Sequence, residues 1–264
     1  MLNEREDMKV IANYHTHTTR CKHARGEDRE YVEAAIASGL KILGFADHTP
    51  YPTGTGYESF MRMAPEEFEG YVTSLTALRE EYKKDIEIYI GVEAEYFPAY
   101  FDKLVDFMKD YPLDYMILGN HFVDDEEHGR SVGVAFENVE LLSRYVDNVI
   151  EAMKTGKFAY IAHPDLPLYV GPGGETVRAA AFRKMCKAAK EYNVPLEINV
   201  NGYTRGIQYP SDTLFSVAAE CGNDVIVGFD VHDPKQFFNI DDINHCANIA
   251  KKYNLNLLKT LNLG

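Results

Sequence analysis

Short apolar runs alternate with amphipathic stretches along the whole chain. Apolar runs of about four to eight residues are typical of buried strands, and they occupy 10–15, 41–46, 86–92, 115–120, 158–162, 195–200 and 224–229. After each run, apolar positions recur with a period of about 3.6 residues, which predicts helices at 28–38, 65–84, 99–109, 137–155, 175–192, 212–221 and 239–253. The chain therefore reads as seven consecutive strand–helix units.

Strands that are apolar on both faces and separated by helices favour parallel pairing with right-handed crossovers. The first strand runs into Tyr14-His15-Thr16-His17 and lacks the glycine fingerprint of a doubly wound nucleotide-binding sheet. We therefore predict an α/β fold, a distorted (β/α)7 barrel. The 264 residues contain no Pro/Gly/Ser-rich linker, so residues 1–264 are expected to form a single domain.

The first ten residues, MLNEREDMKV, are charged and carry no apolar stretch of the signal-peptide type, and no later apolar run approaches membrane-spanning length. We expect a soluble, cytoplasmic protein without a membrane partner. The four cysteines show no CxxC spacing, which indicates reduced thiols, and of these only Cys21 precedes a histidine closely enough to lie near chemistry.

The formal charge of −14 makes long nucleic acid an unlikely partner, because binding a polyanion normally needs a clustered basic face. A small anionic substrate stays possible, since bound divalent cations reverse the local field inside a pocket. The sequence leaves the oligomeric state open.

Seven of the nine histidines, together with two acids, follow predicted strands or the loop that leaves the first strand. They are His15, His17, His23, His48, Glu93, His121, His163, Asp230 and His232. In a β/α barrel these positions meet at the C-terminal mouth, where active sites of this fold are built. A single histidine at a strand end can merely satisfy a backbone carbonyl, but the coincidence of nine such positions predicts a shared metal site.

Imidazoles combined with carboxylates suit Zn²⁺, Mn²⁺ or Fe²⁺, and nine candidate ligands exceed what one ion can use. The pattern therefore predicts two or three divalent metal ions. Neighbouring metals activate water and clamp the oxygens of a displacement, which is the machinery of phosphate ester hydrolysis.

These residues resemble the PHP (polymerase and histidinol phosphatase) family, and within it the stand-alone histidinol-phosphatases. The resemblance covers almost the whole chain. It rests on His15-x-His17, Cys21-Lys22-His23, Phe45-Ala46-Asp47-His48-Thr49-Pro50, Gly91-x-Glu93, Gly119-Asn120-His121, Ala162-His163-Pro164-Asp165, Glu197-Ile198-Asn199 and Asp230-x-His232, in the family's order.

The resemblance implies a trinuclear centre. One metal would be held by His15, His17, Glu93 and Asp230, a second by Glu93, His121 and His163, and a third by His23, His48 and His232. Glu93 would bridge the first two metals. Asp230, Glu93 and His232 are the implied catalytic residues, with Asp230 as the candidate proton donor to the leaving group.

The resemblance also implies the reaction, hydrolysis of L-histidinol phosphate to L-histidinol and phosphate in histidine biosynthesis. Arg205 is the candidate ligand for the substrate phosphate, although the segment 199–210 departs from the family's pattern around that residue. A PHP phosphoesterase acting on nucleotides or other small phosphate esters is the main alternative. An amidohydrolase is disfavoured because 114–120 contains no lysine, and a non-catalytic PHP module because every ligand position is filled.

Overall fold

The computed structural model describes residues 9–263, so the first eight residues, on which the N-terminal expectation largely depends, lie outside it. The described part keeps the predicted alternation, and six of the seven predicted strands form. They are β1 (Ala12–Asn13), β2 (Ile42–His48), β3 (Glu87–Ala94), β4 (Tyr115–Leu118), β7 (Leu196–Asn199) and β8 (Asp224–Gly228). Strand β1 is shorter than predicted.

The strands pair in parallel around a closed circuit. Strands β1 to β4 follow one another in order, and β7 pairs with β8. Isolated bridges join the two groups: Ile161 pairs with Leu118 of β4 and with Leu196 of β7, and Thr16 pairs with Val231 beyond β8. The prediction of an α/β fold, a distorted (β/α)7 barrel, is confirmed, with the bridges at Ile161 in place of one strand.

The fifth segment is where the prediction of a strand at 158–162 is wrong. Its pairing on each side is an isolated bridge at Ile161 and not a ladder, with hydrogen bonds from Ala162 to Leu118 and from Ile161 to Pro195. The backbone then leaves the extended conformation at His163, whose φ is 29°. A second source of distortion is β9 (Asn256–Leu257), which the pattern did not predict and which pairs with the start of β8.

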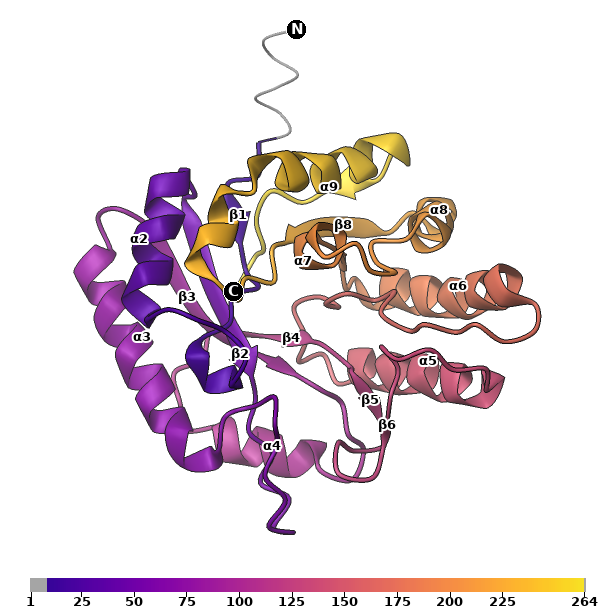
Figure 1. Cartoon of the computed structure of the whole chain (residues 1–264), viewed down its shortest axis with the longest axis horizontal. Coiled ribbons are helices and arrows are strands. Elements are labelled where there is room, and N and C mark those ends of the chain that lie inside the picture. Colours follow the sequence, from indigo (N-terminus) through magenta and orange to yellow (C-terminus); the bar gives the residue numbers. More distant parts are fainter. Residues whose placement is uncertain (1–8, 264) are drawn as a thin grey trace, which may run out of the picture.

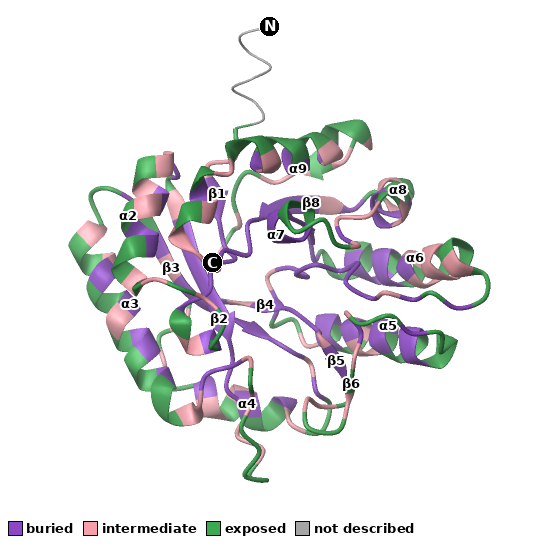
Figure 2. Ribbon diagram, viewed as in Figure 1, coloured by how far each residue is buried: buried purple, intermediate pink, exposed green. Residues whose placement is uncertain are grey.

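Helices surround the strands (Figure 1), and their buried faces point inward (Figure 2). They are α2 (Asp28–Ser38), α3 (Phe68–Tyr82), α4 (Phe101–Met108), α5 (Val139–Lys154), α6 (Gly174–Tyr192), α8 (Asp212–Cys221) and α9 (Ile240–Lys252). Each lies within a few residues of its predicted range. The prediction missed the short helix α7 (Val200–Thr204) and the hairpin of β5 (Phe122–Val123) and β6 (Arg130–Ser131). It also missed the 3-10 helices η1 (Thr19–Cys21) and η3 (Pro234–Phe238).

Tyrosine side chains fill the interior of the barrel. The buried Tyr115 places its hydroxyl 2.7 Å from the carbonyl oxygen of Tyr14 and 2.9 Å from that of Phe45. Its ring takes the space that a Cβ would need at Gly44 or Gly91, where the added atom would lie 2.4 or 2.5 Å from the tyrosine. The barrel is therefore a packed core, and the open space lies at its mouth.

Within residues 9–263, no helix combines the length and the apolar character needed to cross a membrane.

Candidate metal centre

All nine predicted ligands come together at the C-terminal ends of the strands. Eight of them line a cavity of about 1060 Å³, and His15 lies buried directly beneath it. The pairing of β2 with β3 sets His48 beside Glu93, and the bridge between Thr16 and Val231 brings the first and last segments together. Parallel pairing thus gathers residues that are more than 200 positions apart in the sequence.

Four buried side chains form a compact cage. The Nε2 atom of His15 lies 3.6 Å from Glu93 Oε2 and 3.6 Å from Asp230 Oδ1. The Nε2 atom of His17 lies 3.5 Å and 3.2 Å from the same two oxygens. A tetrahedral zinc ion with ligands at about 2.0–2.1 Å keeps its ligand atoms about 3.4 Å apart. These four separations are close to that value, and the ligand atoms of His15, His17 and Glu93 all lie within 4.8 Å of one another.

Three atoms that face the centre of this cage have no hydrogen bond within the described part of the chain. His15 Nε2, His17 Nε2 and Glu93 Oε2 are buried without a hydrogen bond among the described residues. Orphaned buried polar atoms are costly. A cation at this position would satisfy all three at once.

The second carboxylate oxygen of Glu93 faces a different pair of histidines. Glu93 Oε1 lies 2.9 Å from His163 Nε2 and 3.9 Å from His121 Nε2. Because the two oxygens of one carboxylate address separate ligand sets, Glu93 has the geometry of a bridging ligand.

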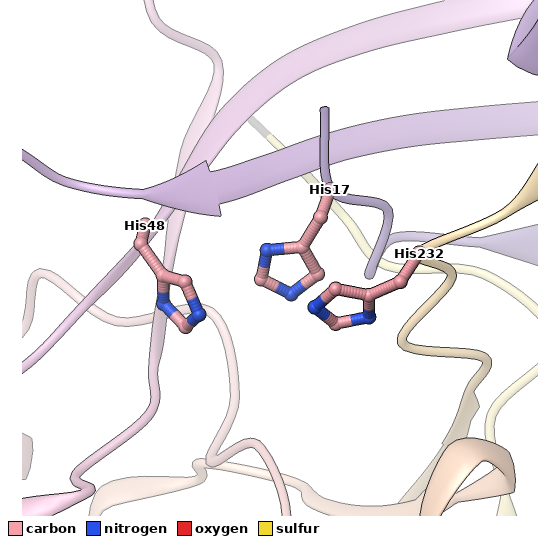
Figure 3. Close-up of side chains that lie close together, drawn as sticks. All are labelled: His17, His48 and His232. Atoms are coloured by element: carbon pink, nitrogen blue, oxygen red, sulfur yellow. The ribbon is translucent and has the colours of Figure 1, made fainter. Parts of the chain in front are cut away.

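The remaining histidines lie on the open side of the cage. The Nε2 atoms of His23 and His232 lie 3.0 Å from each other. The Nδ1 atom of His48 lies 2.8 Å from Glu93 Oε2. Figure 3 shows the rings of His17, His48 and His232 around one point, where their ligand atoms lie within 4.8 Å of one another. His48 was assigned with His23 and His232 to the third metal. In the structure it lies between these two histidines and the cage, closer to Glu93 than to His23.

Electrostatics in the cage favour bound positive charge. Burial alone would raise the pKa of Glu93, but the imidazoles of His48, His15 and His121 outweigh it and hold that pKa well below its usual range. For His15, burial opposes protonation, yet the charges of Glu197, Asp230 and Glu93 raise its pKa to about 10. Without metal the cage holds protons, so metal binding must release them.

Backbone conformation departs from the usual at two of the ligands. His163 and Asp230 have φ angles of 29° and 54°, in the left-handed region that few non-glycine residues occupy. Such strain concentrates at functional sites, where the surroundings hold it in place. Here it turns both side chains into the cage at the ends of their segments.

Supporting residues hold the predicted ligands in place, a role that the sequence pattern did not indicate. Glu197 accepts the main-chain N–H of His163 at 2.8 Å and lies 2.8 Å from His15 Nδ1. The Asn199 side chain donates to the same carboxylate at 2.8 Å. Metal-binding histidines are commonly oriented by a carboxylate on the other ring nitrogen. The available signal was the position of Glu197, a charged residue inside the otherwise largely apolar predicted strand 195–200.

On the opposite wall, Asp47 has a similar role. Its Oδ1 lies 3.4 Å from His17 Nδ1, and its Oδ2 accepts the Thr18 main-chain N–H at 3.2 Å. Cys21 is buried beside these groups, with its sulfur within 4.8 Å of the ligand atoms of His23 and His232. The expectation that Cys21 lies near chemistry agrees with this placement.

Arg205 lies at the C-terminal cap of α7 and is exposed at the rim of the cavity, together with Arg25 and Lys235. Within the described part of the chain, Arg205 forms no ion pair. Its guanidinium is therefore free to contact a bound anion. The remaining two histidines lie elsewhere: His128 is exposed in the turn between β5 and β6, and His245 stacks on Tyr203 with the ring centres 4.0 Å apart.

A cage of histidines and carboxylates at the mouth of a β/α barrel is typical of metal-dependent hydrolases. Residues 13–201 match the family described as PHP domain. Since this match spans most of the sequence, the chain belongs to the PHP domain family.

Two curated relatives cover most of the chain. A protein of Deinococcus radiodurans named "Probable histidinol-phosphatase" is 27% identical over 241 residues, 86% of this chain and 88% of the relative. A protein of Schizosaccharomyces pombe with the same name is 26% identical over 246 residues, 84% of this chain and 80% of the relative.

A solved structure shares the fold. Histidinol phosphate phosphatase from Lactococcus lactis, complexed with zinc, L-histidinol and phosphate, superposes with a TM-score of 0.73. It is 21% identical in sequence, and the superposition covers 96% of this chain and 99% of that one.

Replacing Gly119 tests how tightly the bridge is held. A Cβ at Gly119 would lie 1.8 Å from Glu93 Oε1, so Gly119→Ala must displace the carboxylate. We expect Gly119→Ala to lose at least one metal equivalent by elemental analysis. The control is Gly70→Ala in α3, where a Cβ meets nothing within 4 Å, and it should keep wild-type metal content. Equal metal content in both variants would contradict the bridging geometry.

Replacing Glu93 tests the bridge directly. We expect wild-type protein purified without chelator to carry two to three transition-metal equivalents, and Glu93→Gln to carry at least one fewer, because a neutral amide cannot hold two cations together. Glu87→Gln, at the exposed start of the same strand, is the matched control. Fewer than one equivalent in the wild type would rule out the cluster.

Proposed function

We propose that this chain is a metal-dependent phosphomonoesterase that hydrolyses L-histidinol phosphate to L-histidinol and phosphate. The observation that carries the proposal is that the two oxygens of Glu93 face separate ligand sets within one open cavity. Paired metals suit the cleavage of phosphate esters. The names of the two relatives and the ligands in the Lactococcus lactis structure support this substrate.

Two to three divalent ions, Zn²⁺, Mn²⁺ or Fe²⁺, fit the donor set of imidazoles and carboxylates. The cage of His15, His17, Glu93 and Asp230 would hold one, and Glu93 with His121 and His163 a second. His23, His48 and His232 are the proposed ligands of a third. When bound, such ions lower the pKa of water and neutralise the charge on phosphate oxygens.

Asp230 is suited to hold positive charge. Its Oδ2 accepts hydrogen bonds from the side-chain amides of Asn199 and Asn201, both at 3.2 Å. Burial would raise its pKa, but His15 and the other imidazoles lower it well below the usual range. A carboxylate this acidic accepts protons poorly and gives none up near neutrality, so the metal-ligand role is favoured. Its role as proton donor to the leaving group stays a prediction.

The rim of the cavity combines cations with apolar side chains. Arg25, Arg205 and Lys235 supply positive charge near the imidazoles, where a phosphate would bind. Phe60 and Ile207 provide apolar surface for the alcohol part of an ester. This arrangement lets a chain of net charge −14 accept a small anion. We expect the protein to act on this small substrate in the cytoplasm.

The size of the cavity also suits a second class of substrate. A volume of about 1060 Å³ is slightly above the range of ordinary ligand pockets, about 300–1,000 Å³. It therefore has room for a mononucleotide or another small phosphate ester larger than histidinol phosphate.

A panel of phosphomonoesters separates these substrates. We expect phosphate release with Mn²⁺, Zn²⁺ or Fe²⁺ to be fastest with histidinol phosphate, measured as kcat/KM. Mononucleotides and p-nitrophenyl phosphate are the comparison substrates. A higher kcat/KM for a nucleotide would favour the alternative, and no phosphate release from any ester would refute the phosphatase.

Replacing Arg205 tests the proposed phosphate contact. Arg205→Ala should lower kcat/KM by roughly 10- to 10³-fold, because a charge-assisted contact to the phosphate is lost. Arg205→Lys should recover only part, since an ammonium keeps the charge without the planar fork. Arg183→Ala, on the exposed face of α6 where Arg183 pairs with Glu220, should behave as wild type. If Arg205→Ala keeps the wild-type kcat/KM, the substrate phosphate must be bound by groups other than Arg205.

A further inference from the structure

A buried arginine connects three loops beside the metal centre. Arg62 lies between β2 and α3 and is only 2% exposed. Its Nη2 is 2.6 Å from Glu95 Oε1, and its Nε donates to Glu126. The guanidinium also lies over the ring of Tyr51, 5.6 Å from the centroid. One cation therefore holds two buried carboxylates that come from different segments of the chain.

The first of these carboxylates holds the backbone of a proposed metal ligand. Glu95 Oε2 accepts the main-chain N–H groups of His121 and Phe122, each at 3.0 Å. The other oxygen, Oε1, lies 3.4 Å from His121 Nδ1 and is the atom that Arg62 contacts. Glu95 thus stands behind the His121 ring, while Nε2 on the opposite side of that ring faces Glu93.

The second carboxylate ties down the loop that carries Arg62. Glu126, in the turn between β5 and β6, accepts the Ser59 hydroxyl at 2.5 Å and lies 3.2 Å from the Tyr57 hydroxyl. Phe60 and Met61, on the same loop, line the metal cavity. Through Arg62, the position of this cavity wall and the position of His121 are set together.

Stability alone gives little reason for such a network. A buried ion pair is often replaceable by apolar side chains at no loss of stability, because desolvation offsets the attraction. What a buried ion pair does provide is a fixed geometry for the groups it joins. Here the geometry that is fixed belongs to His121, which lies between β4 and the β5–β6 hairpin. Its carbonyl oxygen accepts the Val132 N–H at 2.9 Å, and its own N–H is held by Glu95.

We propose that Arg62 is a positioning residue for the metal centre, acting through Glu95 to hold His121 in place for a metal ion and to keep the Phe60–Met61 wall against the cavity. The inference depends on the assignment of His121 as a metal ligand in the proposed function. It predicts that replacing Arg62 weakens the binding of the metal ion held by His121 more than the binding of the other metal ions.

Zinc titration against a competing chromophoric chelator tests this inference with no need for a substrate. Two variants perturb the network: Arg62→Lys keeps the charge but cannot contact both carboxylates as a fork does, and Glu95→Gln removes the charge behind His121. Each should weaken one zinc equivalent by roughly 10- to 100-fold, the usual effect of losing a residue that orients a metal ligand. The remaining equivalents should stay within about twofold of wild type.

Arg79→Lys is the matched control, since Arg79 pairs with Asp114 at 2.8 Å on a partly exposed surface. It should titrate as wild type. Wild-type affinities in both Arg62→Lys and Glu95→Gln would overturn the inference. So would equal weakening of all equivalents, or loss of folded protein in both variants, because either result assigns the network a purely structural role.

The proposed function fails in a different way. Wild-type protein that binds less than one zinc equivalent would refute the metal centre, and the inference with it. Wild-type protein that binds zinc but hydrolyses no phosphate ester would refute the phosphatase and leave the Arg62 inference to be decided by its own variants.

Discussion

The buried carboxylate of Glu93 is the constraint on which the site depends. It is buried, and each of its oxygens faces a different set of imidazoles. A buried anion is costly unless it is paired, so the strands around it must deliver positive charge to both oxygens. Gly119 on the neighbouring segment leaves the space in which this carboxylate lies, because any side chain there would overlap it.

The barrel meets this demand through its topology. Parallel strands end at the same edge, so a residue at the end of each one contributes to the same cavity. The strand ends are also where the backbone can leave the extended conformation, as it does at His163 and Asp230. Below them, tyrosines such as Tyr115 close the interior, and the ligands thus rest on a rigid floor.

Around the ligands, a layer of carboxylates and amides sets their orientation. Glu197 and Asp47 face the outer ring nitrogens of His15 and His17, and Glu95 supports the main chain at His121. These contacts limit the freedom of each imidazole before a metal binds, which increases the metal affinity of a preformed site. The acidic surroundings also explain how a chain of charge −14 gathers cations at one end of its barrel.

The order of elements and the set of candidate ligands could be read from the sequence, because hydrophobic periodicity is local and because strand ends in a parallel barrel share one mouth. The sequence could not give the partners of those ligands. The contact of Glu197 with His15 spans 182 positions, and the bridge that replaces a fifth strand depends on two neighbouring segments. Nothing in the local pattern distinguishes Glu95, which follows β3 and is held by Arg62, from Glu87, the exposed acid at the start of β3. Only the packed barrel decides such pairings, since they join segments whose separation in sequence carries no signal of their contact in space.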